Sequence, residues 1–193
     1  MRSGVLCAGS IVVDVGKVID AYPPQERIAV IESVTSSTGG PAVNLAVDLA
    51  RLGALFPLAV AGVIGQDEHG DFMLEALAAD AIDTSRVRRT PDAATSFTDA
   101  MVVRDGGSRT FFHHVGANGL FEEADVDFAS STARILHMGA PGLHPAMDVG
   151  HGWERVFEAA QAAGMRTNLE LVSLAPDEIQ AVGAPCLPHL DSI

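Results

Sequence analysis

The chain has 193 residues, of which 48% are apolar, and it carries a formal net charge of −13 with a pI near 4.7. This composition can bury a substantial core and excludes a disordered or fibrous protein. The acidic charge would repel a phosphate backbone or an anionic bilayer, so we expect no nucleic-acid partner and no membrane-surface role.

The first predicted strand covers residues 4–13, an apolar run rich in β-branched residues that ends at Asp14. In an open α/β sheet the carboxyl ends of the strands line the ligand crevice, where Asp14 would accept hydrogen bonds from substrate hydroxyls. A turn-forming aspartate explains the residue equally well on local grounds. Two short strands at 17–20 and 26–34 follow in place of a crossover helix, which predicts strands that leave the main sheet.

Residues 38–44 join two glycines to the start of a strongly patterned helix over 41–52. Gly39 and Gly40 would let a ligand approach the main chain closely, and the proline that follows them suits the first helical position. Asn44 lies on the polar strip of the helix. Free N–H groups beside an amide suit an oxygen-rich ligand such as a sugar or a phosphate. An ordinary capped helix is the alternative, and the glycines alone favour it.

The middle of the chain contains a strand, a helix and a second pair of strands outside the β-α rhythm. A strand is predicted at 56–64 and a helix over 69–79. We expect Asp67, in the turn between them, to order the turn rather than to contact a ligand. Residues 95–103 and 109–115 predict a hairpin around a glycine-rich turn. The two strand pairs would make a small four-stranded sheet, whose apolar face needs cover from substrate or a partner chain.

The last third of the chain returns to alternating strands and helices. A glycine-containing loop at 116–119, flexible enough to act as a hinge, leads into it. The predicted elements are an acidic helix at 122–130, a strand at 135–139, a helix at 147–163, a strand at 165–171 and a short helix at 176–182. Residues 191–193 predict the beginning of another strand, so we expect the architecture to be incomplete.

The histidines raise the question of a metal site. His137, His144 and His151 recur every seven residues, and His113 and His114 form a pair. Their spacing crosses a strand, a loop and a helix start, unlike the close ligand pairs of zinc and iron sites, so we predict no metal site there. The chain also has no G-x-S-x-G elbow, no Walker A sequence and no G-x-G-x-x-G after the first strand, which removes the main support for a hydrolase or a dinucleotide-binding protein.

The cysteines and the N-terminus bear on the cellular compartment. Cys7 and Cys186 are too few for a disulfide framework and lack metal-ligand spacing, so we predict two buried thiols in a reducing environment. The N-terminus has no signal-peptide pattern, and the chain has no apolar run of about 20 residues. We therefore expect a soluble, cytoplasmic protein.

Four motifs, in order along the chain, resemble the ribokinase/PfkB family of carbohydrate kinases. They are Gly9 to Asp14, the run Gly39-Gly40-Pro41-Ala42-Val43-Asn44-Leu45-Ala46 continuing to Gly53, Gly65-x-Asp67-x-x-Gly70, and Gly116-Ala117-Asn118. The resemblance spans essentially the whole chain. It implies an α/β fold, a ribokinase-like doubly wound sheet flanked by helices, with a small β-sheet lid. Residues 1–193 would be the N-terminal portion of a single domain, with lid strands at about 15–37 and 95–115.

The resemblance also implies an activity, the ATP-dependent phosphorylation of a sugar hydroxyl with Mg²⁺, and a lid that closes over the sugar and often forms a homodimer. Family sugar contacts carry over to Asp14, Gly39, Gly40, Asn44, Thr98 and Phe111. By this resemblance Asp14 and Asn44 would bind sugar hydroxyls. The glycines would allow close backbone approach, and Phe111 would form an apolar wall.

Some features depart from the ribokinase pattern. Pro41 stands where many ribokinases have lysine, and Ala140 stands where they have an acidic residue, which disfavours ribose. The family's second signature, with its glycine-rich anion hole and catalytic aspartate, belongs to a C-terminal part that these residues do not contain. We therefore expect a sugar kinase represented by its sugar-binding side, with no catalytic residue and no activity in this chain alone. A non-catalytic sugar-binding or lid-dimerising fragment is the alternative, and a nucleoside is the alternative substrate.

Overall fold

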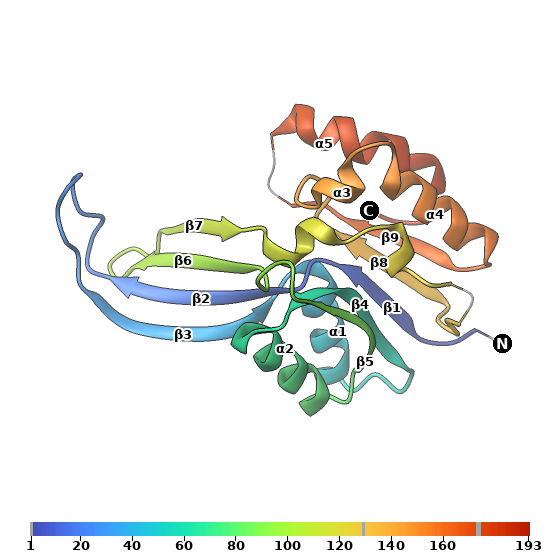
Figure 1. Cartoon of the computed structure of the whole chain (residues 1–193), viewed down its shortest axis with the longest axis horizontal. Coiled ribbons are helices and arrows are strands. Elements are labelled where there is room, and N and C mark those ends of the chain that lie inside the picture. The colour runs from blue at the N-terminus through green and yellow to red at the C-terminus, as the bar shows by residue number, and fades with distance from the viewer. Residues whose placement is uncertain (1, 129, 173–174) are drawn as a thin grey trace.

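The computed structural model describes residues 2–128, 130–172 and 175–193 (Figure 1). The strands are β1 (Val5–Gly9), β2 (Val12–Ile19), β3 (Ile31–Gly39), β4 (Leu58–Gly65), β5 (Asp83–Thr90), β6 (Phe97–Val103), β7 (Arg109–His114), β8 (Ile135–Gly139) and β9 (Arg166–Glu170). The α-helices are α1 (Pro41–Arg51), α2 (Glu68–Ala79), α3 (Pro145–Asp148), α4 (Gly152–Ala162) and α5 (Pro176–Gly183). Short 3-10 helices are η1 (Gly116–Leu120), η2 (Glu123–Asp125) and η3 (Ala184–His189).

The main sheet is parallel, five-stranded and covered by helices on both faces, with strand order β5-β4-β1-β8-β9 (Figure 1). One core cluster joins β1 and β4 to α1 and α2 through side chains such as Val43 and Met73. The other joins the sheet to α3 and α4 through Met147, Trp153 and Phe157. All five residues of β1 are buried, as expected for a parallel strand covered on both faces. The α/β prediction is therefore confirmed.

The second sheet has the order β3-β2-β6-β7 and projects away from the main sheet (Figure 1). β2 pairs antiparallel with β3 and parallel with β6, and β6 pairs antiparallel with β7. The prediction that the two strand pairs unite in one four-stranded sheet is therefore correct. Much of this sheet faces solvent, since every residue of β7 is exposed and Val34 on β3 is 59% exposed.

The strand predicted over residues 4–13 is wrong, because the chain there forms two strands in two different sheets. β1 ends at Gly9, whose φ of +115° turns the backbone, and after Ser10 and Ile11 the chain enters the second sheet as β2. β2 and β3 then pair from Val12 opposite Gly39 to Ile19 opposite Ile31, so the predicted boundaries at 17–20 and 26–34 are also corrected. An apolar run has the same pattern whether it fills one sheet or two.

Three later elements also differ from expectation. The apolar patterns do not predict β5, because this edge strand is largely polar and only partly buried. The helix predicted over 147–163 is divided into α3 and α4, since Gly150 and His151 have φ values of +62° and +63°. Of the acidic helix predicted over 122–130 only η2 forms, and residue 129 lies outside the described residues.

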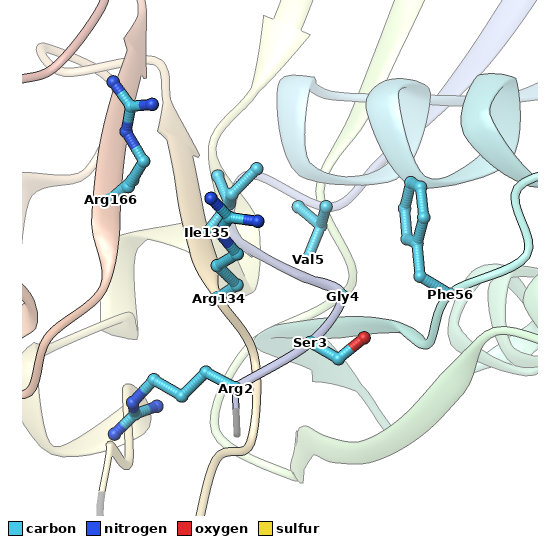
Figure 2. Close-up of a pocket in the computed structure, with 8 residues that line it drawn as sticks. All are labelled: Arg2, Ser3, Gly4, Val5, Phe56, Arg134, Ile135 and Arg166. Carbon is cyan, nitrogen blue, oxygen red and sulfur yellow. The ribbon is translucent and has the colours of Figure 1, made fainter.

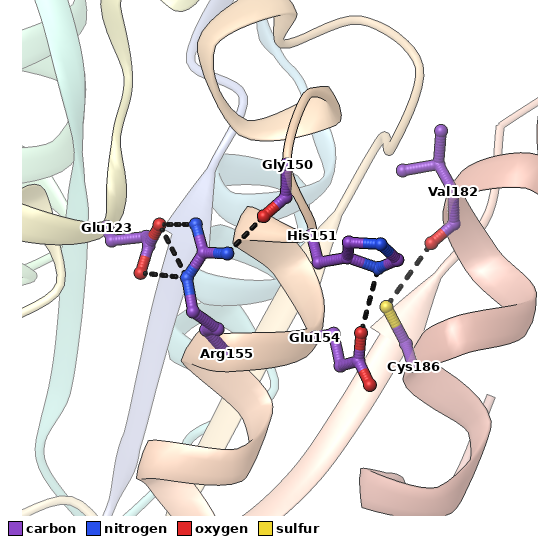
Figure 3. A network of polar contacts seen from close by, with 7 residues as sticks. All are labelled: Glu123, Gly150, His151, Glu154, Arg155, Val182 and Cys186. Atoms are coloured by element: carbon purple, nitrogen blue, oxygen red, sulfur yellow. Dashed lines mark hydrogen bonds and ion pairs between the residues drawn. The ribbon is translucent and has the colours of Figure 1, made fainter.

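Side-chain contacts fasten the start of α4 to its neighbours (Figure 3). Arg155 binds the carboxylate of Glu123 on η2, with Nε 2.9 Å from Oε2, and also contacts the carbonyl of Gly150.

Both cysteines are buried and free, as expected. Burial raises the pKa of Cys7 to about 12 and that of Cys186 to about 11, so both stay thiols at neutral pH. In the described part of the chain no helix has the length and apolarity needed to cross a bilayer.

Asp67 is the N-cap of α2 and also fastens the segment before β6. Its carboxylate accepts hydrogen bonds from the backbone N–H of Gly70 (2.9 Å) and from the N–H (2.7 Å) and hydroxyl (2.6 Å) of Thr95. Burial works to raise the pKa of Asp67, but these hydrogen bonds to the ionised carboxylate lower it overall. The prediction that Asp67 orders its turn is confirmed.

We expect Asp67→Asn to reduce the free energy of unfolding by about 1–2 kcal/mol at neutral pH, because an amide is a weaker acceptor. A carboxylate whose pKa is lowered in the folded state stabilises the fold above its unfolded-state pKa of 3.8, and this stabilisation is lost as the pH falls through the folded-state pKa. Urea unfolding at decreasing pH should therefore show the wild-type advantage shrinking in acid. An advantage that stays constant down to about pH 2 would contradict this role.

Candidate functional site

The candidate site begins where β2 and β3 lie side by side close to the main sheet. Asp14 is the third residue of β2, and its half-buried carboxylate lies directly over the backbone of Gly39, the last residue of β3. A Cβ atom at Gly39 would overlap both carboxylate oxygens of Asp14. Only glycine therefore leaves room for the carboxylate in this position.

The next residue, Gly40, is the N-cap of α1 and has φ +87° and ψ 141°, which a residue with a side chain rarely adopts. A Cβ atom there would also overlap the carbonyl of Ser10 at the end of β1. No side chain caps α1. Asn44 lies in the first turn, where its N–H donates to the Gly40 carbonyl at 2.9 Å and its side chain is exposed. The predicted arrangement of two glycines and an amide at a helix start is thus present.

A row of polar residues crosses the second sheet at Asp14. Its neighbours in register are Ser37 on β3 and Thr98 on β6, and Thr98 in turn lies opposite His113 on β7. Thr98 is 8% exposed, and its Oγ1 lies 2.9 Å from Nδ1 of His113. Burial raises the pKa of Asp14, and a hydrogen bond from Thr98 works in the opposite direction.

Phe111 is two residues from His113 on β7, so its ring belongs to the same face of the second sheet as Asp14. Its partner in register is Ala100, next to Gly16, and the ring is 60% exposed. Arg109 lies over the ring, with Cζ 5.8 Å from the centroid. Small neighbours leave the aromatic ring standing above the sheet as an apolar surface.

The structure brings together four of the six predicted site residues, Asp14, Gly39, Gly40 and Thr98. Asn44 is one helical turn away on α1, and Phe111 shares the face of Asp14 further out on the sheet. One expectation is corrected, since Asp14 does not end a strand of the main sheet but belongs to the second sheet. It nevertheless lies just beyond the carboxyl end of β1, at the edge where α/β proteins bind ligands.

A buried network that the sequence does not reveal holds the junction between the two sheets. His144 donates from Nδ1 to the carbonyl of Asn118 (3.0 Å), which leaves Nε2 to accept the Ser10 hydroxyl at 2.8 Å. The Asn118 side chain accepts the N–H of Ile11 at 3.2 Å. Burial lowers the pKa of His144 to about 4. Residues 116–119 are consequently not an open loop, because they form η1 with Asn118 buried against this junction.

The described residues contain no group of three or more His, Cys, Asp or Glu side chains that could hold a metal ion. His137, for example, is 2.6 Å through Nδ1 from the Asn168 side chain, and His151 pairs with Glu154 at 2.9 Å. The Mg²⁺ that the resemblance implies finds no such group among the described residues.

A hollow of about 470 Å³ lies at the opposite end of the main sheet, near the amino ends of β1 and β8 (Figure 2). Its lining residues are Arg2, Ser3, Gly4, Val5, Phe56, Arg134, Ile135 and Arg166. The guanidinium of Arg2 already has partners, since it donates to the carbonyls of Ser131 (2.9 Å) and Ala133 (3.1 Å). The hollow is thus separate from the residues around Asp14.

Comparison with known proteins identifies the family of the chain. The family model of the pfkB family carbohydrate kinases matches residues 3–191, and the chain therefore belongs to this family. Ribokinase from Staphylococcus aureus (strain COL) is 29% identical over 195 residues, which cover 94% of this chain and 62% of that protein.

Solved structures show the same fold. A fructokinase with bound ATP from Xylella fastidiosa is 25% identical and has a TM-score of 0.67, covering 92% of this chain and 54% of that one. Ribokinase from Thermotoga maritima is 19% identical with a TM-score of 0.78, covering 99% of this chain and 58% of that one. The ribokinase-like fold is confirmed, and the chain spans little more than half the length of these relatives.

The close approach at Gly40 can be separated from backbone strain by a matched pair of variants. Gly40 and Gly53 have similar φ values, +87° and +83°, but an added Cβ meets the Ser10 carbonyl at Gly40 and open space at Gly53. Gly53→Ala should cost about 1 kcal/mol of stability, and Gly40→Ala about 1–3 kcal/mol more. Equal losses in denaturant unfolding would show that Gly40 is not constrained by this contact.

Proposed function

We propose that this chain forms the sugar-binding side of a kinase that transfers a phosphoryl group from ATP to a sugar hydroxyl. The observation that carries the proposal is the carboxylate of Asp14 lying over Gly39 beside the uncapped start of α1. Family membership and relatives named ribokinase and fructokinase support a sugar as the ligand.

The chemistry of the site suits a polyhydroxylated ring. An ionised carboxylate only accepts hydrogen bonds, so Asp14 would bind one or two sugar hydroxyls, while the amide of Asn44 can both donate and accept. The two glycines permit close approach to the main chain, and Phe111 offers an apolar surface to the less polar side of the ring. Fixing the sugar in this way orients one hydroxyl for attack, and positioning is the main contribution that proteins make to phosphoryl transfer.

The second sheet would act as the lid over the sugar and as a homodimer surface. Its exposed apolar side chains, Ile31 and Val34 on β3 and Phe111 and Phe112 on β7, are between 44% and 60% exposed. The bound substrate would cover Phe111 on the face of Asp14, and a second copy would cover Val34 and Phe112 on the opposite face. Sedimentation velocity at increasing protein concentration tests the dimer, and a monomer at every concentration would rule it out.

The first test of the proposed function replaces Asp14. Calorimetric titration with D-ribose and with D-fructose identifies the sugar that the wild-type chain binds. We expect Asp14→Asn to weaken this binding by about 10- to 100-fold, the usual cost of losing hydrogen bonds to a charged group. Asp99→Asn is the matched control, because Asp99 follows Thr98 on β6, faces the other way and pairs with Lys17 at 2.6 Å. Equal effects of the two variants would remove Asp14 from the site.

The second test concerns catalysis by the chain itself. A purely sugar-binding role is the second candidate, because the chain covers 62% of its ribokinase relative. We expect the purified 193-residue chain to consume no ATP above a blank in the presence of the sugar that it binds. A coupled assay of ADP release measures this, and steady turnover that depends on the sugar would show that the chain catalyses the reaction unaided.

A further inference from the structure

We propose that Thr98 and His113 are positioning residues, which hold the Asp14 carboxylate in one orientation through a row of hydrogen bonds across the second sheet. The inference rests on the proposed function for its purpose, because it assigns the row to sugar binding. The row itself can be tested without any sugar. It also changes the expected role of Thr98, which the family resemblance placed in direct contact with the sugar.

The geometry begins with strand register. Asp14 on β2 lies opposite Thr98 on β6, and Thr98 lies opposite His113 on β7, so the three side chains occupy one face in adjacent strands. Thr98 Oγ1 is 2.9 Å from His113 Nδ1, and Thr98 is the register neighbour of Asp14 on the adjacent strand. Gly39 lies on the other side of the carboxylate. Asp14 is therefore placed between a glycine backbone and a threonine.

The protons can be assigned from the donors and acceptors available. In the proposed row the single hydroxyl proton of Thr98 is directed at the carboxylate, because an ionised Asp14 can only accept. Thr98 Oγ1 must then accept from His113, which places a proton on Nδ1 in both the neutral and the charged form of the imidazole. Because its proton is committed to Asp14 and it is 8% exposed, Thr98 has no donor left for a sugar hydroxyl.

The surroundings of the row explain why such support is useful. Burial raises the pKa of Asp14, which works against the ionised acceptor that a sugar requires, whereas the Thr98 hydrogen bond lowers it. Burial lowers the pKa of His113, and the neighbouring His114 acts in the same direction. The charge of His113 also contributes to the lowered pKa of His144 in the junction.

The opposite face of the sheet supplies an internal control. His114 is adjacent to His113 but points to that face, where its ring lies 5.1 Å from the ring of Phe97. The Lys17–Asp99 ion pair also belongs to that face. A substitution of His114 thus changes the same strand and removes the effect of His114 on the pKa of His113, but it removes no hydrogen bond of the row.

The decisive experiment is a carbon-detected NMR titration of the Asp14 carboxyl group in the full chain, without ligand. We expect Thr98→Val to raise the pKa of Asp14 by about one pH unit, because an isosteric side chain without a hydroxyl cannot donate. Thr98→Ser should restore the wild-type value. His113→Leu should raise the pKa in the same direction, and His113→Asn, which can place an amide donor near the position of Nδ1, should recover part of the difference. His114→Leu should leave the Asp14 titration unchanged.

Sugar binding provides the second readout. Since the ionised carboxylate binds, affinity for D-ribose or D-fructose should fall as the pH drops through the pKa of Asp14, and in Thr98→Val this fall should move to higher pH. A purely packing role would reduce affinity equally at every pH. If the pKa of Asp14 in Thr98→Val equals that of the wild-type protein, the proposed row of hydrogen bonds is wrong. Failure of the wild-type chain to bind either sugar would count against the proposed function, while the NMR titration would still decide the row.

Discussion

The contact between the Asp14 carboxylate and the backbone of Gly39 is the constraint on which the rest of the site depends. It fixes the start of β2 against the end of β3, immediately before the chain turns through Gly40 into α1. A side chain at either glycine would displace a carboxylate or a carbonyl. One short segment therefore determines where the acceptor lies, how α1 begins and how the second sheet joins the main sheet.

The junction between the sheets is built as a rigid support. A neutral His144 imidazole bonds both the Ser10 hydroxyl and the Asn118 carbonyl, and the Asn118 side chain in turn accepts the N–H of Ile11, all in buried surroundings. Because the second sheet leaves the main sheet at these residues, its position over the start of α1 is set by this network. Motion of the second sheet as a lid would have to occur beyond it, along β2 and β3.

The fold class and the local backbone around the candidate site could be predicted from sequence because their signals are local. The helix start at Gly40 and the N-cap at Asp67 are of this kind, and both are found in the structure. What could not be predicted depends on distant pairing. The break after Gly9 is hidden in a continuous apolar run, and the partnership of His113 with Thr98 follows from the hairpin register, which period-2 alternation alone does not fix.

We propose that Asp14 and the two glycines bind a sugar at the carboxyl end of β1. A crystal structure of the chain with D-ribose or D-fructose, whichever it binds, tests this claim most directly. We expect a sugar hydroxyl within hydrogen-bonding distance of the Asp14 carboxylate and the sugar ring against Gly39 and Gly40. A sugar bound elsewhere, for example in the arginine-lined hollow at the amino ends of β1 and β8, with Asp14 free of contact, would contradict it.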